Sequence, residues 1–178
     1  MMTLNSFNFN TTPGIRFGSG QAKDACKEIF NKLGSRILFI TDKGLMSLGL
    51  TKPTIEEIKK MASVEVFDDV EADPSQKTLL KAIEIGKKFK TTGVIGFGGG
   101  SSMDIAKLSA LILGSNEDLE KAWGVANAKG PRLPLVLFPT TAGTGSEVTP
   151  ISIITVGEEE KKGVSSPIIL PDLAILDP

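Results

Sequence analysis

The 178-residue sequence contains no histidine and no tyrosine, and it has a single cysteine. Histidine is the commonest general base and the commonest metal-binding side chain, so its absence removes both roles from this chain. One cysteine without histidine cannot form a zinc site or an internal disulfide. We therefore expect no catalytic residues and no metal ligands here. Any chemistry of this chain must use Asp, Glu, Lys, Ser or Thr side chains.

Charge and hydropathy exclude further classes of protein. The formal net charge is -1, and no block of basic residues occurs, so the sequence gives no support to nucleic-acid or anionic-membrane binding. No apolar run approaches the roughly 18 residues of a membrane-spanning helix, and no charged-then-apolar leader precedes a cleavage site. We expect a soluble, cytoplasmic protein.

Short apolar segments alternate with amphipathic ones along the whole chain. This alternation predicts an α/β fold with a mainly parallel sheet, helices on both faces and one domain over residues 1–178. The predicted strands are 15–17, 36–42, 64–67, 93–97, 133–139, 151–156 and 173–177. The predicted helices are 22–33, 54–61, 73–89 and 101–113.

Local signals suggest where some of these elements begin. Thr54, with Glu57 three residues later, fits a capping box, and Asp73 before Pro74 fits an N-cap. The charged segment 157–163 reads as a flexible turn. Cys26 lies on the apolar side of the predicted helix 22–33, so we expect a buried, inert thiol.

A glycine-rich motif, GFGGGSSMDIAK at residues 96–107, joins a predicted buried strand to a predicted helix. Glycine lets backbone N–H groups approach an anion, and a helix N-terminus adds free donors and a partial positive charge. Residues 98–101 are therefore candidates for binding a pyrophosphate. The alternative is a tight turn with Ser101 as N-cap and Asp104 in the first helical turn. The motif is neither a P-loop nor GxGxxG in a first strand–helix turn.

Two further segments end predicted strands at the same rim of the sheet. Asp42 could accept hydrogen bonds from a ribose 2′-hydroxyl and would repel a 2′-phosphate, which favours NAD over NADP. Alternatively, Asp42 caps the following helix. The motif PTTAGTGSEVT at 139–149 combines hydroxyl side chains with glycines, which suits phosphate and ribose contacts, although Ser/Thr-rich loops are common.

The two motifs together resemble the iron-containing (group III) alcohol dehydrogenase family. The segments TTPGIRFGSG at 11–20 and LPDLAILDP at 170–178 are similar to the same family, in the same order. The resemblance implies a Rossmann-like, dehydroquinate-synthase-like N-terminal domain that binds NAD, or less readily NADP. It also implies a C-terminal helical domain whose aspartate and three histidines bind Fe²⁺ or Zn²⁺.

The resemblance implies a cofactor-binding role for individual residues of this sequence. Asp73 falls where many members of the family have Asn, and Lys162 is an alternative to Lys161 by one register step. The candidate cofactor-binding residues are Asp42, Asp73, Gly98, Gly99, Gly100, Ser101, Asp104, Thr140, Thr141, Thr144, Ser146 and Lys161.

In this family the metal ligands follow the segment that matches LDP at 176–178, where this sequence ends. We therefore expect the cofactor-binding half of an NAD-dependent enzyme that interconverts small alcohols and aldehydes, inactive by itself. Ile151, Ile153 and Leu176 would then be uncovered, and we expect self-association and a homo-oligomeric parent. One alternative is a stand-alone nucleotide-binding module. The other is a relative of dehydroquinate synthase or glycerol dehydrogenase, and the TTAGTGSE sequence argues against a dehydroquinate-synthase type of enzyme.

Overall fold

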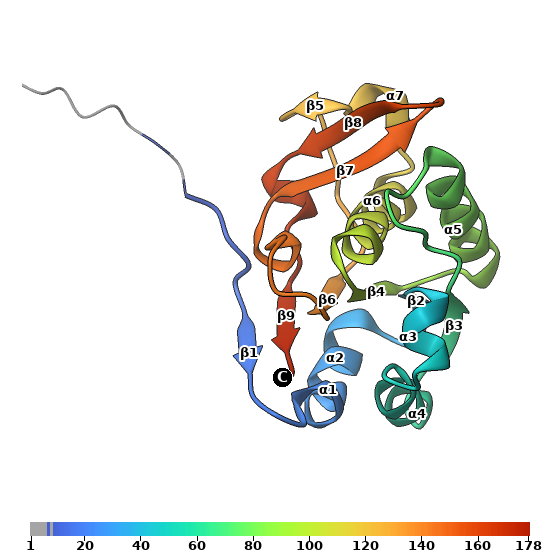
Figure 1. Ribbon diagram of the computed structural model, residues 1–178, viewed down its shortest axis with the longest axis vertical. Coiled ribbons are helices and arrows are strands. Elements are labelled where there is room, and N and C mark those ends of the chain that lie inside the picture. The colour runs from blue at the N-terminus through green and yellow to red at the C-terminus, as the bar shows by residue number, and fades with distance from the viewer. Residues whose placement is uncertain (1–6, 8) are drawn as a thin grey trace, which may run out of the picture.

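A six-stranded parallel sheet forms the centre of the molecule (Figure 1). The computed structural model describes Phe7 and residues 9–178. The strand order is β1-β9-β6-β4-β2-β3, and every neighbouring pair is parallel, which confirms the predicted sheet. The strands are β1 (Ile15–Phe17), β2 (Arg36–Ile40), β3 (Ser63–Phe67), β4 (Gly93–Gly98), β6 (Leu135–Pro139) and β9 (Leu173–Leu176).

Helices cover both faces of this sheet. One face carries α1 (Gln21–Asp24), α2 (Cys26–Leu33) and α4 (Lys52–Lys59), and the other carries α5 (Gln76–Phe89) and α6 (Gly100–Ser115). The short helices α3 (Lys43–Ser47) and α7 (Leu119–Ala122) lie outside these two layers. Among the described residues, no helix is long and apolar enough to cross a membrane.

The core divides into two apolar clusters because successive strand residues point to opposite faces of the sheet. Leu38 and Ile40 of β2 belong to the α5–α6 cluster, whereas Phe39 belongs to the opposite cluster with α2 and α4. On that face Phe39, Phe97 and Phe138 stack across three adjacent strands, with ring centroids 5.7 and 5.2 Å apart. Full burial of each such ring contributes about 1.5–3 kcal/mol, so this face is firmly fixed.

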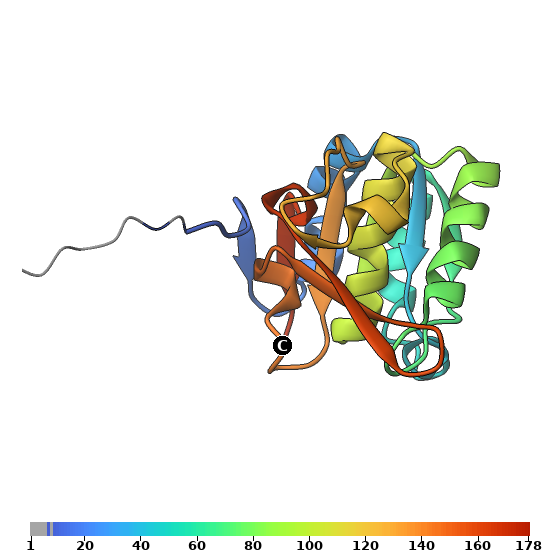
Figure 2. The ribbon, with the colours of Figure 1, turned by 90° about the horizontal axis from the view of Figure 1, so that it is seen from above.

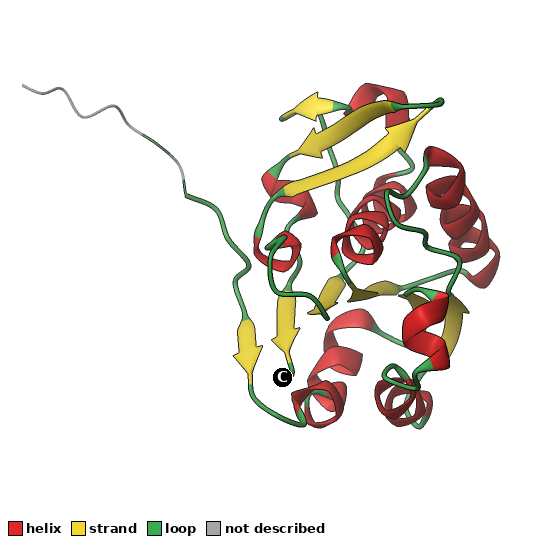
Figure 3. Ribbon diagram, viewed as in Figure 1, coloured by secondary structure: helices red, strands yellow, loops and turns green. Residues whose placement is uncertain are grey.

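A second, smaller sheet lies over α6 on the side away from the large sheet (Figures 2 and 3). It contains β5 (Gly124–Val125), β7 (Ile151–Val156) and β8 (Glu160–Ser165), and β7 pairs antiparallel with β8. The prediction of a flexible turn over 157–163 was therefore wrong for residues 160–163. The charged residues of this segment give no apolar alternation that would predict a strand, although Val164 of the same strand is buried.

Several element boundaries differ from the predictions. The helix predicted at 22–33 is split at Ala25 into α1 and α2, and the Asp177 carboxylate accepts hydrogen bonds from two N–H groups at the start of α1. The capping box at Thr54 was wrong, because α4 begins two residues earlier and Thr54 is fully buried inside it. Asp73 is not the N-cap of α5. Ser75 is, accepting from Thr78 N–H at 3.2 Å.

The chain reverses its direction across the sheet between β2 and β4. From β2 it passes through α4 to the edge strand β3, and it then returns through α5 to β4 on the other side of β2. Because α4 and α6 cover opposite faces, the segments leaving β2 and β4 diverge at their carboxyl ends. In open parallel sheets this divergence creates the crevice in which ligands bind.

The buried position of Cys26 yields a prediction about its reactivity. Its thiol is 1% exposed, and burial, followed by the nearby charges of Glu57 and Asp24, raises its pKa to about 11. The thiolate is the nucleophile, so at pH 8 the folded chain should react with a thiol-specific chromogenic disulfide at least about tenfold more slowly than the urea-unfolded chain. Equal rates in the two states would place Cys26 outside the core.

Candidate nucleotide-binding site

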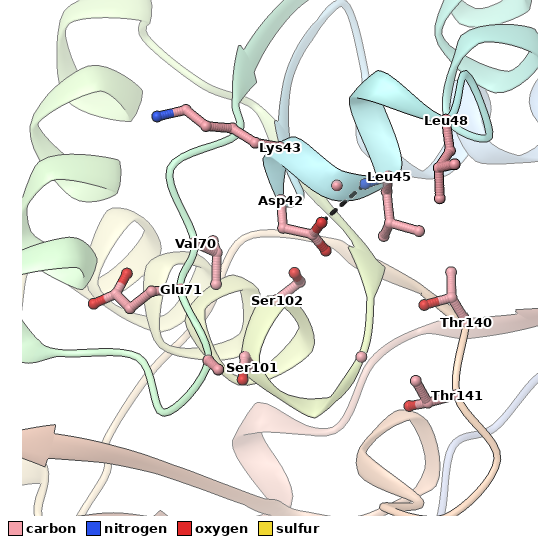
Figure 4. Close-up of a pocket in the computed structure, with 13 residues that line it drawn as sticks. Asp42, Lys43, Leu45, Leu48, Val70, Glu71, Ser101, Ser102, Thr140 and Thr141 are labelled. Carbon is pink, nitrogen blue, oxygen red and sulfur yellow. Dashed lines mark hydrogen bonds between the residues drawn. The ribbon is translucent and has the colours of Figure 1, made fainter.

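A cavity of about 560 Å³ lies in the crevice at the carboxyl ends of β2, β3, β4 and β6 (Figure 4). It is the place where the diverging segments predict a ligand site. Four separate segments line it. The lining residues are Asp42, Lys43, Gly44, Leu45, Leu48, Val70, Glu71, Ala72, Gly99, Ser101, Ser102, Thr140 and Thr141.

The glycine loop forms the floor of this cavity. Helix α6 begins at Gly100, and its N-cap, Gly99, has no side chain to occupy the free N–H groups of the first turn. Gly98 has φ 152°, a backbone conformation that L side chains rarely adopt, and an added Cβ there would meet Ser102 Oγ at 2.6 Å. Ser101 is inside the helix rather than its cap, so that alternative was wrong. The loop exposes N–H donors at the positive end of a 16-residue helix.

Asp42 caps the following helix, one of the two roles that the sequence left open for its position, and it also faces the cavity. One carboxylate oxygen, Oδ1, accepts a hydrogen bond from Leu45 N–H at 2.9 Å and caps α3 (Figure 4). The same side chain lines the cavity. Lys43 also lines the cavity, but its ammonium group is directed away from Asp42 and pairs with Asp69. The cavity therefore has a carboxylate at its β2 wall, and the adjacent ammonium group has a partner elsewhere.

The loop after β3 supplies a wall that the sequence patterns did not reveal. Val70, Glu71 and Ala72 line the cavity there, whereas the predicted Asp73 does not. Glu71 turns away and accepts hydrogen bonds from Thr78 Oγ1 at 2.7 Å and from Ser75 N–H at 3.0 Å. Burial raises the Glu71 pKa, but these hydrogen bonds outweigh it and hold the pKa below its ordinary value. Its charge thus anchors the loop to the start of α5.

The Thr/Gly motif after β6 packs directly against the glycine loop. Thr140 N–H donates to Gly98 O at 3.0 Å, and Thr140 and Thr141 both line the cavity. Thr144 is outside the cavity, but a Cβ on Gly100 would lie only 3.0 Å from its methyl group. The two motifs, separated by about forty residues in the sequence, therefore form one surface.

Asp104 and Ser146 lie behind this surface, in a hydrogen-bonded network that also contains Lys107. Ser146 Oγ donates to Asp104 at 2.7 Å and accepts from the fully buried Lys107 Nζ at 2.8 Å. Burial lowers the Lys107 pKa to about 8, opposed by Asp104 and Glu147, and burial also raises the Asp104 pKa. Sequence inspection did not select Lys107, although a lysine at an otherwise apolar helix position is the signal that could have identified it.

Asp73 and Lys161 lie together, away from the cavity. Lys161 Nζ pairs with Asp73 Oδ1 at 2.8 Å, which links β8 to the loop before α5. Asp73 has φ 52°, a left-handed conformation that short polar residues tolerate. Both side chains are substantially exposed, so this ion pair contributes little to the free energy of folding. The register alternative, Lys162, instead faces Glu120 at 3.7 Å.

The metal implied by the sequence resemblance does not fit the described part of this chain. Among those residues, no group of three or more His, Cys, Asp or Glu side chains is arranged to hold an ion. The glycine loop has the chemistry of an anion site, because no side chain caps the N-terminus of α6 and a Cβ on Gly99 would meet no protein atom within 3.4 Å.

The family model for iron-containing alcohol dehydrogenases matches residues 12–178. The chain belongs to this family. Among curated relatives, it is 35% identical to sulfoacetaldehyde reductase of Bilophila wadsworthia, with 97% of this chain aligned. It is 38% identical to choline dehydrogenase of Bacillus subtilis, with the whole chain aligned. Each alignment spans 45% of the relative, so the chain covers less than half the length of these family members.

Solved structures of family members share the fold. A 1,3-propanediol oxidoreductase superposes with a TM-score of 0.91 at 28% identity, over 97% of this chain and 46% of that one. Sulfoacetaldehyde reductase from Bifidobacterium kashiwanohense, solved with NAD⁺, superposes with a TM-score of 0.85 at 31% identity, also over 97% and 46%. The Rossmann-like architecture of the family's N-terminal portion is thus confirmed.

The glycine floor can be tested with a variant that leaves the protein's own packing undisturbed. A Cβ on Gly99 would meet nothing closer than Thr141 Oγ1 at 3.5 Å, so Gly99→Val should fold normally while its methyl groups fill the anion approach. We expect at least about tenfold weaker NAD binding in calorimetry, since phosphate contacts with a helix N-terminus require close approach. Gly99→Ala should give a smaller loss. An unchanged affinity, with the circular dichroism spectrum preserved, would remove Gly99 from the site.

Proposed function

We propose that this chain binds NAD in the crevice between β2 and β4 and is the cofactor-binding part of an alcohol dehydrogenase. The observation that carries the proposal is the meeting of the glycine loop and the Thr/Gly motif at one cavity. In this proposal the pyrophosphate lies on the N-terminus of α6, near Gly99 and Ser101. Asp42 accepts from the ribose hydroxyls next to the adenine, and Thr140 and Thr141 contact the cofactor from the β6 side.

The reaction we propose for the whole protein is hydride transfer between NAD and a small alcohol or aldehyde. The relatives support it, since they include a sulfoacetaldehyde reductase, a choline dehydrogenase and a 1,3-propanediol oxidoreductase. The contribution of this chain is to bind and orient the dinucleotide. The described residues provide no metal-binding cluster, so we assign no catalytic step to them.

The competing function is a nucleotide-binding module without catalysis. The missing metal-binding cluster in the described residues favours it for this chain alone. Under both readings we expect the isolated chain to bind NAD. We also expect it to oxidise no alcohol and to reduce no aldehyde when Fe²⁺ or Zn²⁺ is present. Dehydrogenase turnover by the isolated chain would contradict both, whereas turnover by a longer form only would favour the enzyme.

Asp42 should set the preference between NAD and NADP. Removing a hydrogen bond to a charged acceptor costs roughly 1.5–3 kcal/mol, so Asp42→Gly should narrow the NAD-over-NADP affinity ratio by about tenfold or more. Asp42→Asn is the matched control for the helix cap, because its amide oxygen can still accept from Leu45 N–H while the charge is lost. It should narrow the ratio as well. Ratios in both variants equal to that of the wild type would leave Asp42 as a helix cap only.

Exposed apolar side chains support the proposal that the protein self-associates. Phe17 of β1 is 75% exposed, and Ile151 and Ile153 of β7 are 44% and 48% exposed, while Leu176 is half-buried. Exposed apolar groups of this kind mark surfaces that another protein part covers. Light scattering at high concentration should find species larger than the monomer, and the double change Ile151→Thr, Ile153→Thr should reduce them. A strictly monomeric wild-type chain would contradict the proposal.

A further inference from the structure

Lys107 is a fully buried cation that the proposed function does not use. It lies on the second turn of α6, and its side chain has no exposed surface. Its ammonium donates to Ser146 Oγ at 2.8 Å, to Thr149 O at 3.0 Å and to Ile151 O at 2.8 Å. All three donors of an ammonium group are therefore satisfied, which is the condition under which a charge can be buried.

Asp104 completes the arrangement one helical turn earlier. Its Oδ1 accepts from Ser146 Oγ, and its Oδ2 accepts from Ile153 N–H at 3.0 Å. The Asp104 carboxylate lies 3.9 Å from the Lys107 ammonium, and the Ser146 hydroxyl bridges the two charges. We call Asp104, Lys107 and Ser146 the α6 clamp.

The clamp joins the two nucleotide-facing segments from behind. Asp104 and Lys107 follow the glycine loop on one rigid helix, and their partners are the end of the 140–149 segment and the start of β7. The tip of that segment, residues 140–144, is largely exposed and contains Gly143. At its other end the segment is joined to the end of β4 by the Thr140 N–H bond to Gly98 O, and the clamp supplies the charged contacts between the segment and α6.

We propose that Lys107 is a positioning residue that, through the clamp, holds the 140–149 segment against the glycine loop in the form that receives the dinucleotide. Lys107 does not line the cavity, so it acts through Ser146 and the Thr149 and Ile151 carbonyl groups rather than on the ligand. Without it these three acceptors lose their donor, and the segment is free to move away from α6. This inference rests on the proposed NAD site.

The main test is Lys107→Met, which keeps the length and apolar stem of the side chain but removes the charge and all three donors. NAD affinity of the 178-residue chain is measured by calorimetry at a temperature where urea titration finds the variant fully folded. We expect at least about tenfold weaker binding. An affinity equal to that of the wild type would overturn the inference.

Ser152→Ala is the matched control. Ser152 is as deeply buried as Lys107 and donates to the backbone oxygen of Asp104 at 3.0 Å, but it makes no contact with the 140–149 segment in this network. Its removal should lower stability while leaving NAD affinity within about twofold of the wild type. A loss equal to that of Lys107→Met would mean that any weakening of this region affects binding, which would overturn the specific role of Lys107.

Ser146→Ala is the second variant, and it keeps the inference testable if Lys107→Met does not fold. We expect it also to weaken NAD binding. In the double variant the two losses should overlap, because both changes break the same clamp, and contacting residues give non-additive effects. Losses that add fully would mean that Ser146 contacts the nucleotide independently of Lys107, and they would contradict the clamp.

Hydrogen exchange separates this inference from the proposed function. In the absence of nucleotide, amides of residues 140–149 should exchange faster in Lys107→Met than in the wild type, whereas those of β4 and β6 should not. If the wild-type chain binds no NAD, the proposed function fails, and exchange alone then decides whether the clamp exists. Unchanged exchange in the 140–149 segment would overturn the clamp whether or not NAD binds.

Discussion

The parallel pairing of β2 with β4 is the constraint on which the site depends. It places the carboxyl ends of both strands at one rim, while α4 and α6 lead the chain away to opposite faces. The resulting crevice needs no special loop to hold it open, because the diverging helices are fixed by two separate apolar clusters. Gly99 and the start of α6 then lie at its floor, and the Asp42 carboxylate lies at the wall that follows β2. The groups at the site are common ones, and the strand order brings them together at one crevice.

A second level of organisation lies behind the crevice. The connection from β6 to β7 returns over α6, so the smaller sheet packs on the same helix that carries the glycine loop. The buried charge of Lys107 is tolerated at this junction because each of the three N–H donors of its ammonium group has an acceptor. Breaking such a network leaves buried polar groups unpaired and lowers the stability of the fold, whereas a complete network favours a single arrangement of the core. Helix α6 therefore contacts both the glycine loop and the 140–149 segment, the two segments that we propose bind the nucleotide.

The sequence predicted the central strands of the large sheet well because they are buried on both faces and read as uninterrupted apolar runs. Residues 93–97 and 37–40 are the clearest cases. The same reasoning placed the glycine loop and Asp42 at the carboxyl rim of the sheet, since each comes at the end of such a strand. The family assignment depended on two motifs that lie far apart in the sequence and meet in the fold.

Other features could not be read from local patterns because tertiary contacts decide them. The strand at 160–165 is rich in charged residues and exists through pairing with β7. The start of α1 is bound by the carboxylate of Asp177, which is 155 and 157 residues away in sequence from the two N–H groups that donate to it. Asp104, Ser146 and Lys161 lie outside the cavity, and their sequence context alone did not distinguish a contact with ligand from a contact with one another.

An NMR titration of the ¹⁵N-labelled chain with NAD would show directly whether the cofactor binds in this crevice. We predict that the amide shifts concentrate in residues 42–48, 70–72, 99–102 and 140–141, which contain the residues that line the cavity. Shifts confined to other surfaces, or no shifts at millimolar NAD, would contradict the assignment of this crevice as the cofactor site.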